Sequence, residues 1–338
     1  MTFSPLAAVG MANGVRLRHP ALVLTVALVA TTGCGAGNGT SEHHRAQPDA
    51  RFFAASAVWN RALPSRAPLA ADSGALVTEL QRQVRTNGVW INTWSYSVPI
   101  VTVGRRQPRV PVRLDTRYPP LQRDFDSVPV PPGSRPAVGN DRHLVVWQPS
   151  TDTMWEFWHM NRLPDGWHAR WGAKIVRVSH SPGIVPAPEG ATGSGLPLVG
   201  GLITTAELRR GRVDHALAIG LPALRAGMVA APADRTDGRV SSAQSIPMGT
   251  RFRLDPRVDV DSLGLSPVGR MIARAAQRYG MIVRDTSGSV SLYGQAPTPG
   301  RPNVYPSVFR GAYPNQLLAR FPWNRLQVVR APVRRVTG

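Results

Sequence analysis

The stretch that decides the fold is residues 141–173, DRHLVVWQPSTDTMWEFWHMNRLPDGWHARWGA. It contains three runs rich in β-branched and aromatic residues, at 143–148, 153–159 and 167–173, separated by polar turn residues. Successive side chains of a strand point to opposite faces, so one face covers a core and the other meets solvent or a ligand. The pattern predicts an antiparallel β-meander of three strands.

Short strands of the same kind recur outside the meander. The chain has 32 Gly and 32 Pro, and such frequent punctuation is typical of sandwiches and barrels. Apolar spacing and capping residues predict two helices, at 72–86 and 266–279. The Gly/Pro-rich residues 181–202 are expected to form a long loop that is either functional or disordered. Further strands are expected at 89–95, 98–103, 109–115, 213–221, 250–254, 281–285 and 290–293.

These elements predict a mainly β fold. We expect a single antiparallel β-sandwich, jelly-roll-like, with about two helices and long loops. The domain is expected to span residues 51–293, and residues 294–338 are expected to form a basic C-terminal segment packed on it or trailing from it.

The N-terminal region has the three parts of an export signal. Arg16 and Arg18 precede an apolar run, residues 21–30, that is too short to span a bilayer. Small residues follow, and then Cys34, the only cysteine, at the position where bacterial lipoprotein signals carry the lipidated cysteine. Secretion without a lipid is the alternative. The sequence therefore predicts a signal at 1–33, a flexible tether at 34–50 and an extracytoplasmic, lipid-anchored domain without an internal disulfide.

Charge limits the partners that this domain can bind. The formal net charge is +20, and removal of a signal with two arginines and no acid leaves +18. Lys174 is the one lysine, and this arginine bias is typical of a GC-rich, actinobacterial genome. Because an exported protein does not meet nucleic acid, we expect a glycan or an anionic cell-envelope polymer as partner, besides the membrane that the lipid enters. The arginines after Asp285, where no acid occurs, either face such a polymer or are simply solvated. A monomer is expected.

Aromatic residues are concentrated in the predicted meander. Trp155, Trp158 and Trp171 are candidates for contact with the flat C–H faces of a sugar, and His143 and Arg170 for hydrogen bonds to its hydroxyls. The alternative is that these tryptophans belong to the core, as large aromatics do in most domains.

Glu156 lies in the middle of a predicted strand among these aromatics. Burial there would raise its pKa and suit it to general acid catalysis, whereas a salt bridge to a neighbouring arginine is the alternative. Glycoside hydrolysis needs two carboxyls. We predict that Glu156 acts with His215 or Asp141, although His215 can equally be a hydrogen-bonded core histidine. Other acids that could serve as the second carboxyl are Asp152, Asp214 and Asp285.

Signatures of other enzyme classes are absent from the sequence. It contains no nucleophile elbow, zinc-protease helix motif, phosphate loop or dinucleotide fingerprint. It has no calcium-loop spacing, and His43 and His44 lack further ligands nearby, so no metal and no cofactor are expected. Glu207, in a short helical or turn segment, is expected to be structural.

Several motifs occur in an order that resembles a family of secreted, poorly characterised proteins of bacteria, fungi and plants. The resemblance spans residues 90–293 and implies a β-sandwich, concanavalin A-like or jelly-roll-like, associated with extracellular carbohydrate. It implies no specific activity. Its motifs are Asp141-Arg142-His143, the strand of Glu156, and the segments 195–202, 213–217, 248–254 and 277–285.

This chain departs from the family pattern in two loops, at 191–194 and 285–288, which leaves their part in a site open. We expect a lipoprotein that binds or cleaves an envelope or extracellular glycan, as a glycoside hydrolase or lyase if it is an enzyme. The alternative is a non-catalytic binding or scaffold lipoprotein that contacts anionic wall polymers or lipids through its basic surface.

Overall fold

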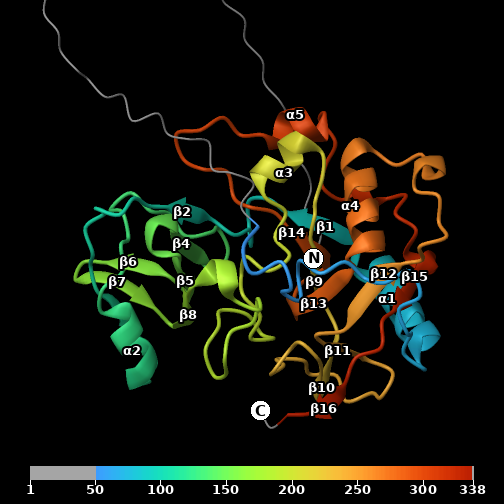
Figure 1. Ribbon diagram of the computed structural model, residues 1–338, viewed down its shortest axis with the longest axis horizontal. Helices are drawn as coiled ribbons and strands as arrows, with labels where there is room; N and C mark the ends of the chain where they lie inside the picture. The colour runs from blue at the N-terminus through green and yellow to red at the C-terminus, as the bar shows by residue number, and fades with distance from the viewer. Residues whose placement is uncertain (1–50, 337–338) are drawn as a thin grey trace, which may run out of the picture. The chain divides into compact units, whose positions relative to one another are not determined.

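A computed structural model describes residues 51–336 of the chain (Figure 1). Residues 1–50 and 337–338 lie outside the described part, so the predicted signal, the tether and the lipid on Cys34 stay predictions. The described residues all belong to one compact unit. No helix within 51–336 is both long enough and apolar enough to span a bilayer.

One half of the fold is a six-stranded mixed sheet. Alternation along the strands sends Leu217, Ile219 and Leu221 to one face, where they pack against α1 (Ser73–Asn87) and α4 (Pro267–Arg278). Both helices are confirmed within one residue of their predicted ends. In order across the sheet the strands are β1 (Val89–Asn92), β14 (Val290–Tyr293), β9 (Leu217–Leu221), β13 (Met281–Thr286), β12 (Arg251–Leu254) and β15 (Leu326–Val328).

The other half contains the predicted meander. A four-stranded sheet has the order β2 (Ile100–Thr102), β4 (Leu144–Gln148), β5 (Thr153–Trp158) and β8 (Trp171–Val176), with β4, β5 and β8 antiparallel as expected. Arg170 divides the third predicted strand, because the residues before it form β7 (Gly166–Ala169) in a separate sheet. That sheet has the order β3 (Val112–Leu114), β7 and β6 (Asn161–Leu163), and α2 (Pro119–Phe125) packs against both sheets in a core around Phe125 and Phe157.

The C-terminal segment is part of the fold. Its strand β15 pairs with β12, and β16 (Val333–Arg335) pairs with β10 (Leu224–Ala230), which is also paired with β11 (Ile246–Met248). The domain therefore extends past the predicted boundary at residue 293. The remaining helical elements are α3 (Thr205–Arg210), α5 (Tyr305–Phe309), η1 (Pro149–Thr151), η2 (Val178–His180), η3 (Asp261–Leu263), η4 (Gln316–Leu318) and η5 (Trp323–Arg325).

The prediction of a β-rich fold is confirmed, but a purely antiparallel sandwich is not. Parallel pairs occur between β1 and β14, β9 and β13, β10 and β11, β2 and β4, and β3 and β7. The period of two in a strand sequence reports which side chains share a face, and it carries no information on the direction of the neighbouring strand.

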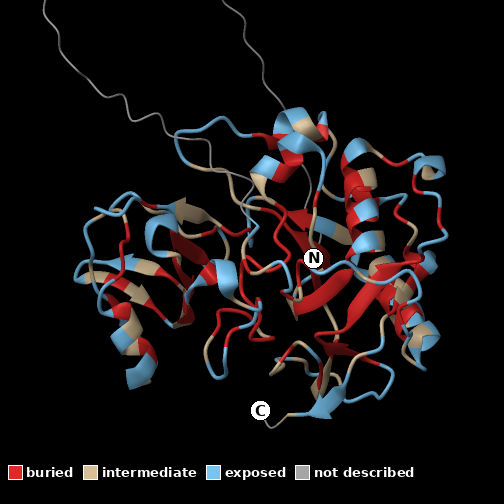
Figure 2. Cartoon of the chain, in the orientation of Figure 1, coloured by how far each residue is buried: buried red, intermediate tan, exposed pale blue. Residues whose placement is uncertain are grey.

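Residues 181–203 form a connection between the two halves that is largely buried from Gly190 onward, whereas residues 184 and 186–188 are exposed. Leu196, Leu198 and Leu202 belong to a core that also contains Met154 of β5 and Ala218 of β9. Figure 2 shows this segment as largely buried chain beside the sheets. The disordered alternative for this loop is therefore wrong, because its apolar side chains fill the space between two sheet faces.

Candidate functional site

Glu156 binds this buried connection and is closed off from solvent. Its side chain is fully buried, and its two carboxylate oxygens accept hydrogen bonds from the backbone N–H groups of Ala191, at 2.9 Å, and Leu198, at 2.8 Å. Burial raises the pKa of Glu156, while these two N–H groups and the charge of Arg284 oppose the rise. In this position both carboxylate oxygens are bonded to the backbone, and His215 is paired with Glu207 instead.

Arg284 holds the same segment from the opposite sheet. Its guanidinium is fully buried on β13, donates to the carbonyls of Leu198 and Gly200, and lies 4.0 Å from the ring centroid of Tyr293. Its Nε and Nη2 atoms have no hydrogen-bond partner in the described part of the chain. Residues 198–200 are thereby fixed between β5 and β13 by two charged side chains.

Arg235 fixes the preceding part of the connection. Its two terminal nitrogens donate to the carbonyls of Pro188, Glu189, Gly190 and Thr192 at 2.6–3.0 Å. Four charge-assisted bonds from one side chain define the backbone at 188–192.

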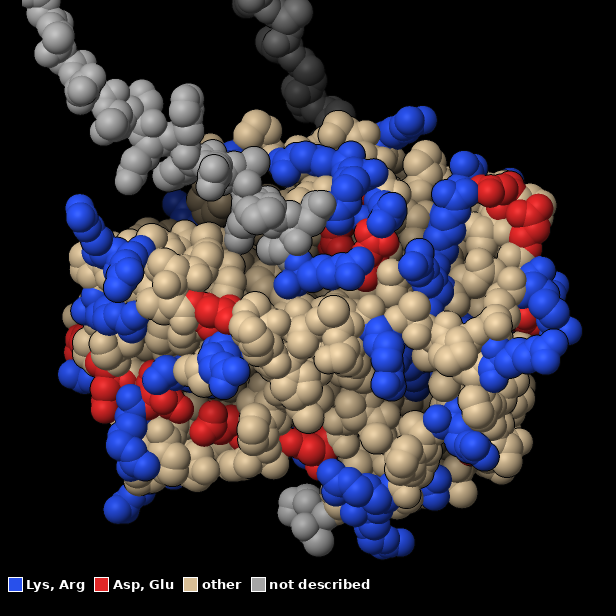
Figure 3. Space-filling model, in the orientation of Figure 1, with Lys and Arg blue, Asp and Glu red and all other residues tan. Residues whose placement is uncertain are grey.

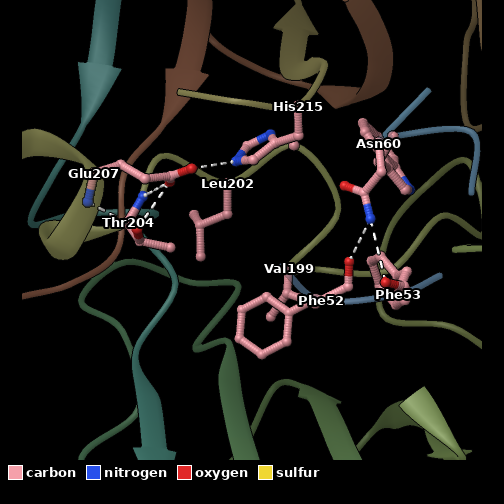
Figure 4. Close-up of a pocket in the computed structure, with 10 residues that line it drawn as sticks. Phe52, Phe53, Asn60, Val199, Leu202, Thr204, Glu207 and His215 are labelled. Carbon is pink, nitrogen blue, oxygen red and sulfur yellow. Dashed lines mark hydrogen bonds and ion pairs between the residues drawn. The ribbon is translucent and has the colours of Figure 1, made fainter. Parts of the chain in front are cut away.

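His215 is paired with Glu207, as Figure 4 shows. Its Nε2 lies 3.0 Å from the Glu207 carboxylate, and its Nδ1 lies 2.8 Å from the carbonyl of Ala216. Burial alone would lower the pKa of His215, but the Glu207 charge outweighs it and the pKa is raised; the pKa of Glu207 is lowered by His215 in spite of its own burial. Glu207 also completes a capping box with Thr204 at the start of α3.

This pair lines a cavity of only about 20 Å³, which has room for about one water molecule. The predicted pairing of His215 with Glu156 or Asp141 is therefore wrong. Glu207, which was expected to be structural, is the partner of His215 and also caps the start of α3.

Asp141 lies at a partly open position just before β4. Its Oδ1 accepts a hydrogen bond from the indole N–H of Trp158 at 3.2 Å, and Arg170 lies 5.3 Å from the centre of that indole ring. His143 on β4 is buried, and its Nδ1 has no hydrogen-bond partner among residues 51–336. Burial, together with the charges of Arg284 and His159, lowers the pKa of His143 to about 4 although the Asp141 charge works the other way. The histidine is therefore neutral near pH 7.

Asp285 supplies a carboxyl from the opposite sheet. It lies at a bulge of β13, accepts a hydrogen bond from the backbone N–H of Gly193 at 3.0 Å, and is half-buried. Burial, then the charge of Asp237 and more weakly that of Asp141, raises the pKa of Asp285 to about 7, against the opposing charge of Arg284. Asp285 is therefore protonated for much of the time at neutral pH, chiefly because it is buried and lies near the charge of Asp237.

Two exposed aromatic residues are linked to the surroundings of these carboxyls, Trp90 through the sheet that carries Asp285 and Tyr96 through Asn140. Trp90, Ser291, Gly220 and Asp285 form one row across β1, β14, β9 and β13, which places the Cα atoms of Trp90 and Asp285 about 14 Å apart. Glycine at 220 leaves the space that the hydroxyl of Tyr293 occupies.

On the other side, the hydroxyl of Tyr96 bonds to Asn140, the neighbour of Asp141. Trp94 is 63% exposed, Tyr96 40% and Trp90 39%. We call Asp141, Asp285, Trp90, Trp94 and Tyr96 the Asp141–Asp285 site.

Of the side chains predicted to contact a sugar, only some lie where a sugar could reach them. Trp155 is buried in the core of the smaller half and donates to the carbonyl of Asp124, so it is a core residue. Trp171 is half-buried, with its indole N–H bonded to the carbonyl of Pro188, while Trp158 and exposed Arg170 lie at Asp141. Sequence reasoning did not identify Trp90 as a candidate for binding. The signal was present, because Val89 and Ile91 alternate with Trp90 and Asn92, which places Trp90 on the face opposite the apolar one.

Within the described residues, no group of three or more His, Cys, Asp or Glu side chains could hold a metal ion. No protein-family model matches the chain, and no curated protein or solved structure matches it either. The resemblance to a secreted family therefore stays a prediction, and the geometry of the Asp141–Asp285 site has to support the function by itself.

Proposed function

We propose that the protein is an exported, lipid-anchored protein that cleaves an envelope or extracellular glycan at Asp141 and Asp285. The observation that carries the proposal is Asp285, whose pKa is raised to about 7 by burial and by the charge of Asp237, with the Asp141 charge adding a weaker contribution. Two carboxyls that differ in protonation are what glycoside hydrolysis requires.

The two carboxyls take different parts in the reaction. Protonated Asp285 donates its proton to the oxygen of the leaving sugar, and the glycosidic bond breaks. Asp141 either takes a proton from the water that attacks the anomeric carbon or attacks that carbon itself, in which case water later releases the sugar. The indole N–H of Trp158 orients the Asp141 carboxylate. The anomeric configuration of the first product, followed by NMR, distinguishes the two routes.

Exposed aromatic rings provide the binding surface in this proposal. Trp90, Trp94 and Tyr96 present large apolar faces to solvent, and such faces pack against the C–H faces of sugars. Arg170 beside Trp158 supplies a donor for a hydroxyl or a uronic acid carboxylate.

The test is a digestion screen of the chain from residue 34, with Cys34→Ser, against envelope polysaccharides. Asp285→Asn and Asp141→Asn should each lower product release about 10²- to 10⁴-fold, the usual contribution of a general acid or base. Asp259→Asn, which alters an exposed aspartate in the loop before η3, is the matched control and should retain full activity. Full activity in both site variants, with folding intact, would reject the assignment of these carboxyls.

The second candidate is a non-catalytic binding protein, supported by the arginine-rich surface in Figure 3. In that case the same screen gives retention of a polymer without products, and neither Asp141→Asn nor Asp285→Asn abolishes it. Retention would then fall with rising salt, because exposed charges are screened.

A further inference from the structure

A second recess lies on the surface beside α3, away from the carboxyl pair. It has a volume of about 300 Å³, and its lining includes Arg51, Arg210 and Arg212 together with Glu207 and Asp214. Figure 3 shows basic side chains gathered over the position that α3 occupies in Figure 1. The recess is large enough for a phosphate-bearing head group.

The carboxylates in this recess are already paired within the protein. Glu207 is bound to His215 and caps α3, and Asp214 is bound by Arg212 at 2.7–2.8 Å. No carboxylate of residues 51–336 pairs with Arg51 or with Arg209, which α3 also exposes. The recess and α3 therefore present an excess of positive charge to an external anion.

The position of Arg51 in the chain suggests which anion this surface meets. Arg51 is the first described residue and follows Cys34 by 17 residues. Any segment of that length spans at most about 60 Å. With the lipid that we propose on Cys34, the α3 face lies within this distance of the bilayer.

We propose that Arg51, Arg209 and the adjoining recess form a docking surface for anionic lipid head groups. Contact there orients the domain on the membrane and adds a second, electrostatic attachment to the lipid anchor. This inference rests on the lipid anchor of the proposed function but not on glycan cleavage, so a digestion screen without products would leave it standing.

The test uses the unlipidated chain from residue 34, with Cys34→Ser, and vesicles sedimented after incubation. We expect binding to vesicles of phosphatidylglycerol and phosphatidylcholine in equal amounts, and none to pure phosphatidylcholine. The double variant Arg51→Gln/Arg209→Gln should bind the mixed vesicles about 30-fold more weakly, from the usual contribution of two basic residues near an anionic surface. The matched control, Arg105→Gln/Arg106→Gln, removes two exposed charges from the loop after β2 and should change binding less than about threefold.

Thermal unfolding of each variant establishes that the domain is intact. Equal losses in the two double variants would overturn the proposal, because they would show attraction by net charge alone. Unchanged binding in Arg51→Gln/Arg209→Gln, or equal binding of the parent to both kinds of vesicle, would also overturn it.

Discussion

Glu156→Gln tests whether Glu156 is a structural clamp or a catalytic acid. In the folded protein, each of the two carboxylate oxygens accepts one backbone N–H, at 2.9 Å from Ala191 and at 2.8 Å from Leu198. Glutamine has nearly the same shape, but it replaces one acceptor by an NH₂ group. One of the two buried N–H groups then faces another donor.

The loss can be estimated from these two bonds. A hydrogen bond to a charged group contributes about 1.5–3 kcal/mol, and a buried N–H left without a partner costs about 1–3 kcal/mol. We therefore expect Glu156→Gln to lower the free energy of unfolding by about 3 kcal/mol. For a domain of this size, that corresponds to a fall in Tm of about 6 °C or more.

The assay is urea unfolding at neutral pH, with glycan digestion measured at a temperature well below the lowered Tm. Glu189→Gln is the matched control, because Glu189 lies on the same connection and its carboxylate makes no hydrogen bond to the described residues. That control should change stability by less than about 0.5 kcal/mol. If Glu156→Gln leaves stability unchanged but abolishes product release, the clamp assignment is refuted and the carboxyl acts in catalysis.

Three further predictions concern the other titratable groups and the aromatic surface. Asp237→Asn removes a negative charge near Asp285 and should lower the pKa of Asp285 from about 7. The alkaline limb of the profile of activity against pH should therefore move to lower pH. An unchanged limb, or an unchanged carbon-13 titration of Asp285, would contradict the effect of Asp237 on Asp285. Because its pKa is raised in the folded protein, His215 stabilises the fold fully below pH 6.5, and this contribution is lost as pH rises through the raised pKa. Because its pKa is lowered in the folded protein, Glu207 stabilises the fold fully above pH 4.5, and this contribution is lost as pH falls through the lowered pKa. Glu207→Gln should therefore lower the free energy of unfolding by about 3 kcal/mol between pH 4.5 and 6.5, as measured by urea unfolding over a pH series. The variant should also lose less stability than the parent at alkaline pH. If the stability profiles of parent and variant run parallel, the Glu207–His215 pair does not cause the pH dependence. Trp94→Ala should weaken glycan retention about fivefold without changing Tm, because this ring is exposed, and equal retention would remove Trp94 from the binding surface.

The sequence by itself determined the local elements of this protein. Helix caps and apolar spacing located α1 and α4, and alternation located most strands, because these signals act over a few residues. The same alternation placed Glu156 correctly within a strand.

Tertiary structure alone decided what each polar side chain meets. The partners of Glu156 come from residues 35 and 42 positions later in the chain, and His215 is paired with Glu207 across the end of α3. The charge of Asp141, just before β4, acts on Asp285 of β13, which belongs to another sheet. Strand direction and sheet neighbours depend on long-range pairing, for which period-two alternation carries no signal, so the parallel pairs and the carboxyl site emerged only from the folded chain.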